Sequence, residues 1–142
     1  MKLYEIQQPN IEQILQELNI TDYEITPRGV DVNGNVKIPK HWTEIPFQFN
    51  IIDGTFDCWH SSLTSLKNGP RAVGGDFWCN TKITSLQGAP REVGGSFVCG
   101  DTKIVSLQGA PVEVGGSFIC SDTKIKGKPN TTGINIGGSL YW

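Results

Sequence analysis

The sequence predicts a repeat solenoid, mainly of β-structure. We expect a stack of about six short parallel strands over residues 30–142, with an N-terminal α-helical cap over residues 1–29. Two observations lead to this prediction: a short motif recurs six times at nearly constant spacing, and the first 29 residues lack that motif. A chain of 142 residues suits one domain with a substantial core.

The recurring motif joins glycines to a short apolar segment. Its clearest copies cover residues 73–79, 93–99 and 114–120, a related copy covers 52–58, and weaker copies cover 32–38 and 136–142. Successive cysteines of the motif are 20 or 21 residues apart. One such unit cannot bury its apolar face alone, so the units are expected to stack on one another.

Alternation within the motif predicts one strand per unit. Phe97 and Cys99 are expected to point inward and Val98 outward, because successive side chains of a strand face opposite sides. Parallel stacking would align equivalent residues about 4.8 Å apart. We therefore expect one buried column of phenylalanines, formed by Phe56, Phe77, Phe97 and Phe118. The Gly-Gly pairs before Phe77, Phe97 and Phe118 predict a corner with positive φ.

The apolar residues of one unit resemble a leucine-rich repeat. Phe97, Cys99, Ile104 and Leu107 follow its L-x-x-L-x-L-x-x-N/C-x-L pattern. The asparagine place is taken by Ser61, Thr81, Thr102 and Thr123, whose hydroxyls can also satisfy backbone groups. The units resemble the short bacterial type of this repeat, with a proline-bearing return segment in place of the helix.

The sequence pattern TKI-x-SLQGAP-x-EVGGSF-x-C gives a closer resemblance. It is similar to leucine-rich-repeat-like proteins encoded by tailed bacteriophages, and the similarity covers about residues 30–142. The resemblance implies the fold, and it implies a phage accessory protein in the cytoplasm of the infected bacterial cell. It implies no particular activity.

The N-terminal segment carries a helix signal. Asn10 can cap a helix over about residues 11–19, and Gln13 would complete a capping box. The apolar face of this helix would consist of Ile11, Ile14, Leu15 and Leu18. We expect the helix to cover the first coil.

The four cysteines allow two interpretations. Structural zinc sites usually contain close cysteine pairs, whereas these cysteines occupy one inward position of successive coils. A stacked row is a line and not a tetrahedron, which favours a buried, reduced and metal-free ladder. We expect no metal and no cofactor, and disulfides are not expected in a reducing cytoplasm.

The outward strand position predicts a binding surface. It contains Lys37, Asp57, Trp78, Val98, Ile119 and Tyr141. Four apolar residues in consecutive coils would form a continuous exposed row, and soluble proteins rarely expose such a row without a use. We expect Trp78, Val98, Ile119 and Tyr141 to contact a partner, together with Asp57 and with Trp59, which follows Cys58. Two alternatives are that β-propensity alone places these residues there, or that another segment covers them.

A second row consists of the lysines in the repeated Thr-Lys-Ile. Lys82, Lys103 and Lys124 would form a basic ridge that could bind nucleic acid or a nucleotide. The net charge of −2 and the neighbouring Asp101 and Asp122 favour a solvated edge instead.

No motif indicates catalysis. His41 and His60 are isolated in the sequence, and no nucleophile elbow, phosphate loop or zinc-protease motif is present. No apolar run reaches the roughly 18 residues of a membrane helix, and we expect a cytoplasmic protein that binds no membrane. Our leading hypothesis is a non-enzymatic protein-binding module that modulates or blocks a host protein, such as a defence protein. The alternatives are a nucleic-acid or nucleotide binder and a self-assembling structural protein.

The last motif copy predicts self-association. Its strand would include Leu140, and Trp142 occupies the cysteine position. An open strand edge with apolar residues is a template for pairing, so we expect a homodimer through the C-terminal coil. The alternative is that Trp142 folds over the end of the stack and acts as its cap.

Overall fold

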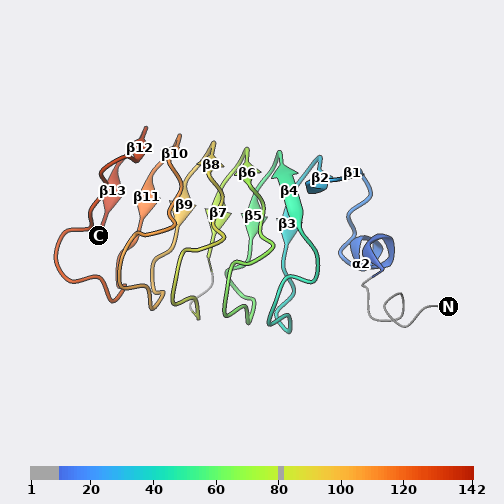
Figure 1. The fold of residues 1–142 in the computed structure, drawn as a ribbon, viewed down its shortest axis with the longest axis horizontal. Coiled ribbons are helices and arrows are strands. Elements are labelled where there is room, and N and C mark those ends of the chain that lie inside the picture. Colours follow the sequence, from blue (N-terminus) through green and yellow to red (C-terminus); the bar gives the residue numbers. More distant parts are fainter. Residues whose placement is uncertain (1–9, 80–81) are drawn as a thin grey trace.

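The computed structural model describes residues 10–79 and 82–142, and it confirms a mainly β, parallel solenoid. About five turns follow one short helix. The coils lie side by side along the longest axis of the molecule, in a nearly straight row (Figure 1).

Each coil contributes two short strands, one to each of two sheets. Sheet A contains β1 (Tyr23–Thr26), β2 (Gly29–Val32), β4 (Phe49–Ile52), β6 (Ala72–Val73), β8 (Glu92–Val93), β10 (Glu113–Val114) and β12 (Asn135–Ile136). Sheet B contains β3 (Val36–Lys37), β5 (Phe56–Asp57), β7 (Phe77–Trp78), β9 (Phe97–Val98), β11 (Phe118–Ile119) and β13 (Leu140–Tyr141). Sheet B is the predicted stack of six strands, whereas the prediction of one strand per coil missed sheet A. Neighbouring strands are parallel except β1 and β2, which pair antiparallel.

The predicted phenylalanine column is present and fully buried. The ring centroids of Phe56 and Phe77 are 5.4 Å apart, those of Phe77 and Phe97 are 5.5 Å apart, and those of Phe97 and Phe118 are 5.1 Å apart. The first two pairs are stacked, with interplanar angles of 6° and 12°. Phe49 of sheet A meets the column edge-on at 5.5 Å. The column therefore joins consecutive coils through their largest apolar side chains.

The Gly-Gly corners differ from the sequence prediction. None of the four Gly-Gly pairs, all of which lie in the described ranges, has positive φ. They are glycines because the coils stack too closely for a side chain: a Cβ on Gly75 would lie 2.6 Å from Thr55 Oγ1, and one on Gly116 would lie 2.6 Å from Ser96 Oγ. Positive φ occurs instead in the return segments, at Gly88 and at its counterpart one coil later, Gly109.

The residue after each corner forms a ladder of hydrogen bonds between coils. Asn35 Oδ1 accepts from Thr55 N (2.8 Å), and Thr55 Oγ1 accepts from Asp76 N (3.1 Å). Asp76 Oδ1 then accepts from Ser96 N (2.8 Å), and Ser96 Oγ accepts from Ser117 N (3.0 Å). Each polar side chain satisfies a backbone amide of the next coil, which fixes the register of the stack.

The N-terminal helix α2 (Ile11–Glu17) is present, two residues shorter than predicted. Asn10 is its N-cap, because Asn10 Oδ1 accepts a hydrogen bond from Gln13 N (3.0 Å). Leu15 is fully buried, and Ile11, Ile14 and Leu18 pack against the same core. Figure 1 shows α2 at the end of the stack beside β1 and β2, where the prediction placed a cap.

Candidate functional site

The register of sheet B places the outward residues of consecutive coils side by side. The paired residues are Lys37, Asp57, Trp78, Val98, Ile119 and Tyr141, one from each strand. In the last four coils the row is apolar, and we call Trp78, Val98, Ile119 and Tyr141 the apolar stripe. The sequence predicted both the membership and the order of this row.

Exposure varies along the apolar stripe. Trp78 and Tyr141 are 39% and 52% exposed, whereas Val98 and Ile119 are half-buried. Gly100 borders Ile119: it is buried, and a Cβ there would lie 3.1 Å from Ser121 O and 3.9 Å from Ile119 Cγ2. The stripe therefore has an exposed aromatic side chain at each end.

The backbone beneath the apolar stripe is fixed. The amides of Cys58, Cys79, Cys99 and Cys120 donate to the carbonyls of Trp78, Val98, Ile119 and Tyr141 at 2.8–3.0 Å. The phenylalanine column lies on the other side of the same strands. These contacts fix the backbone positions from which the four outward side chains project.

Asp57 and Trp59 lie in the coil before Trp78. Asp57 is half-buried, and its Oδ1 accepts a hydrogen bond from Trp59 N (3.0 Å), so it shapes the turn after β5. Trp59 is half-buried and follows Cys58, as Gly100 follows Cys99. Trp59 therefore has the same position in its coil as Gly100 has in a later coil, where Gly100 borders the apolar stripe.

The lysines are in register as predicted. Lys103 N donates to Ile83 O and Lys124 N donates to Ile104 O, both at 2.9 Å, so the Lys-Ile pairs of these three coils stack on one another. Lys82, Lys103 and Lys124 are all exposed, and so are Asp101 and Asp122. Acidic and basic side chains therefore share this edge.

The hydroxyls at the asparagine place behave as expected where they are described. Ser61 Oγ donates to Cys58 O and Thr102 Oγ1 donates to Cys99 O, both at 2.7 Å. Thr123 Oγ1 instead accepts a weaker bond from Ile125 N (3.3 Å). Thr81 lies outside the described residues.

The four cysteines are buried thiols in the core. Desolvation raises the pKa of Cys79 well above its ordinary value, and the neighbouring Cys58 and Cys99 raise it further. Desolvation also raises the pKa of Cys99 and Cys120. Within residues 10–79 and 82–142, no three histidine, cysteine or acidic side chains form a group able to hold a metal ion. Protonated buried thiols are inert, and packing explains their position.

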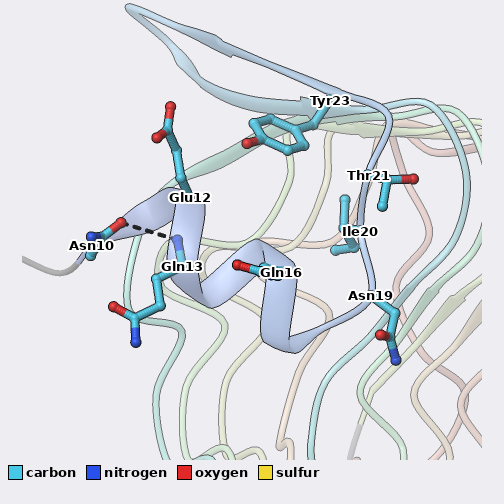
Figure 2. A pocket seen from close by; sticks show the side chains of 8 residues that line it. All are labelled: Asn10, Glu12, Gln13, Gln16, Asn19, Ile20, Thr21 and Tyr23. Carbon is cyan, nitrogen blue, oxygen red and sulfur yellow. Dashed lines mark hydrogen bonds between the residues drawn. The ribbon is translucent and has the colours of Figure 1, made fainter.

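A concavity of about 620 Å³ lies between α2 and the chain that leads into β1 (Figure 2). Its lining is mainly polar and comprises Asn10, Glu12, Gln13, Gln16, Asn19, Ile20, Thr21 and Tyr23. The hydrogen bond drawn in Figure 2, between Asn10 and Gln13, is the helix cap. None of the site residues predicted from the sequence lies here.

The last coil is less buried than the others. Leu140 pairs with Phe118 and is half-buried, while Trp142 is 60% exposed.

The fold and the apolar stripe define this chain as a parallel β-solenoid repeat protein with a partly apolar sheet face. Comparison with protein-family models, with curated proteins and with solved structures gives no match. In the described part of the chain, no helix has the length and apolar character that crossing a membrane requires.

Proposed function

We propose that the chain is a non-enzymatic protein-binding module and that the apolar stripe is its contact surface. The observation that carries this proposal is the alignment of four outward apolar side chains on consecutive strands of sheet B. Tryptophan and tyrosine are enriched in interface hot spots, and both are present here in exposed positions. Asp57 and Trp59 extend the contact surface by one coil.

The biological setting is proposed from the resemblance of residues 30–142 to phage leucine-rich-repeat-like proteins. In that setting the chain is an accessory protein in the cytoplasm of an infected bacterium. It binds a host protein and modulates or blocks it, and a defence protein is one such target.

Nucleic acid is the second candidate partner, because three exposed lysines lie in register on consecutive coils. The exposed Asp101 and Asp122 and the net charge of −2 weigh against it. Binding through the lysines would weaken steeply with salt, whereas binding through the apolar stripe would change little between roughly 50 and 200 mM salt.

Substituting the stripe should abolish capture of a partner. We expect Ile119→Asp and Trp78→Asp each to reduce the amount of partner retained from bacterial lysate by at least about tenfold, because a charge would be buried in an apolar contact. The matched control is Val105→Asp, which changes an apolar residue that is 70% exposed in a return segment. Quantitative mass spectrometry of the retained proteins gives the readout.

Folding is checked in the same variants by circular dichroism and thermal unfolding. A partner that Ile119→Asp retains at the wild-type level, in a folded variant, would contradict the proposal. Loss of the fold would show instead that this face is buried.

A further inference from the structure

We infer that Asn33 is a site of spontaneous deamidation, at which the backbone nitrogen of Gly34 attacks the side-chain amide and releases ammonia. The product is an aspartate or isoaspartate in the corner between β2 and β3, beside Asp22. Three features of the structure support this inference: the place of Gly34 in the stack, the space around it, and the contrast with the second Asn-Gly pair of the sequence.

The place of Gly34 in the first coil leaves its backbone nitrogen without a protein acceptor. In later coils the equivalent glycine donates to the coil before it: Gly54 N donates to Gly34 O (3.1 Å), and Gly75 N donates to Gly54 O (2.8 Å). The first coil follows β1 instead of another coil. Within residues 10–79 and 82–142, no acceptor meets Gly34 N. This nitrogen can therefore give up its proton to solvent, whereas its counterparts are held in hydrogen bonds.

The surroundings of Gly34 leave room for the reaction. Gly34 has no side chain, and a Cβ placed on it would meet no atom of the described residues within 4 Å. Asn33 is exposed, and its Nδ2 donates to Asp22 Oδ2 (2.7 Å). Rotation of the Asn33 side chain toward Gly34 N breaks this contact at the surface, where water can replace it.

The second Asn-Gly pair has the opposite arrangement. Gly69 is buried, and its backbone nitrogen donates to Leu66 O (2.9 Å). The side chain of Asn68 is held as well, because its Nδ2 donates to Ile45 O (3.0 Å). Attack at this pair would break both hydrogen bonds where solvent has little access, so the fold protects Asn68.

The reaction needs only water as a co-reactant. Solvent base removes the proton of Gly34 N, and the nitrogen forms a bond to Asn33 Cγ. The Cγ–Nδ2 bond then breaks, and ammonia leaves with a proton from water. A second water molecule opens the cyclic imide at either carbonyl, which gives aspartate or isoaspartate at position 33. Asparagine is thermolabile in proteins for this reason.

Deamidation should loosen the N-terminal end of the stack. Asn33 joins the chain before β1 to the first coil, because its backbone nitrogen donates to Asp22 O (2.9 Å) in addition to the side-chain bond. A carboxylate at position 33 cannot donate to Asp22 and repels it. The pairing of β1 with β2, which connects α2 to the stack, should therefore weaken. This inference does not depend on the proposed function.

Peptide mass spectrometry of the aged protein tests the inference. The full chain is incubated at mildly alkaline pH, either folded or in urea, and conversion at Asn33 and Asn68 is followed over time. In the folded protein we expect Asn33 to convert at least about tenfold faster than Asn68, because the nitrogen and the amide at Asn68 are held apart from the attack geometry. In urea the two sites should convert at similar rates, since glycine follows both. Equal rates at the two sites in the folded protein, or no conversion at Asn33, would contradict the inference.

The variant Asn33→Asp measures the consequence for the N-terminal end. We expect its thermal midpoint to be about 2–4 °C below that of the wild type, because a repulsive pair replaces one hydrogen bond. The matched double variant, Asp22→Asn with Asn33→Asp, exchanges donor and acceptor and should recover most of this loss. A wild-type midpoint for Asn33→Asp would show that a carboxylate at this position leaves the N-terminal end intact, and it would overturn the inferred loosening.

Discussion

Phe97→Ala should destabilise the protein by about 3–5 kcal/mol. Phe97 is fully buried and lies between Phe77 and Phe118, at ring distances of 5.5 and 5.1 Å. Removing the ring leaves a cavity in the column that joins consecutive coils. Because each coil of a solenoid contacts only its neighbours, the loss cannot be shared with distant parts of the stack. Urea unfolding followed by circular dichroism measures the change.

Val98→Ala on the same strand is the matched control. Its side chain is half-buried on the outward face, so we expect a loss below about 1 kcal/mol. A loss below about 1 kcal/mol for Phe97→Ala as well would mean that the phenylalanine column does not hold the stack together.

Alkaline pH should destabilise the protein through its buried thiols. Burial raises the pKa of Cys79 and of Cys99. Both thiols therefore stay protonated in the folded protein at pH values at which they have already ionised in the unfolded chain. Their contribution to stability is complete below an unfolded pKa of about 8.5 and declines as pH rises from there toward the folded pKa. Each thiol should lower the free energy of unfolding by about 1.4 kcal/mol per pH unit in that window.

Comparing slopes isolates this effect from the titration of lysine and tyrosine. Unfolding free energies of the wild type and of Cys99→Ala are measured under reducing conditions at several pH values above about 9. The slope for Cys99→Ala should be shallower by about 1.4 kcal/mol per pH unit. Equal slopes would show that Cys99 ionises in the folded protein.

The phenylalanine column and the order of the apolar stripe could be predicted because both follow from local alternation and a constant repeat. Sheet A could not be predicted in the same way. Its later strands, such as β8 (Glu92–Val93), contain two residues each, and a single valine faces the core. In sheet B a buried cysteine extends the alternation, as in Phe97, Val98 and Cys99, whereas Val93 is followed by a Gly-Gly pair that shows no such alternation.

Contacts between coils were also missed because no single unit contains them. The Gly-Gly pairs suggested positive φ, but their cause is close stacking against the previous coil, as at Gly116 beneath Ser96. The polar ladder from Asn35 to Ser139 became evident only with the register, although a small polar residue after each corner was its signal. The half-burial of Val98 and Ile119 likewise depends on the three-dimensional neighbourhood.

Site-specific photo-crosslinking shows whether the apolar stripe touches a partner. A benzophenone amino acid replaces Val98 in the apolar stripe, or Val105 in the return segment as the control, and each folded protein is irradiated in bacterial lysate. We predict one predominant protein adduct at position 98 that is absent at position 105. Equal adducts at both positions, or a predominant adduct at position 105 alone, would contradict the assignment of the apolar stripe as the contact surface.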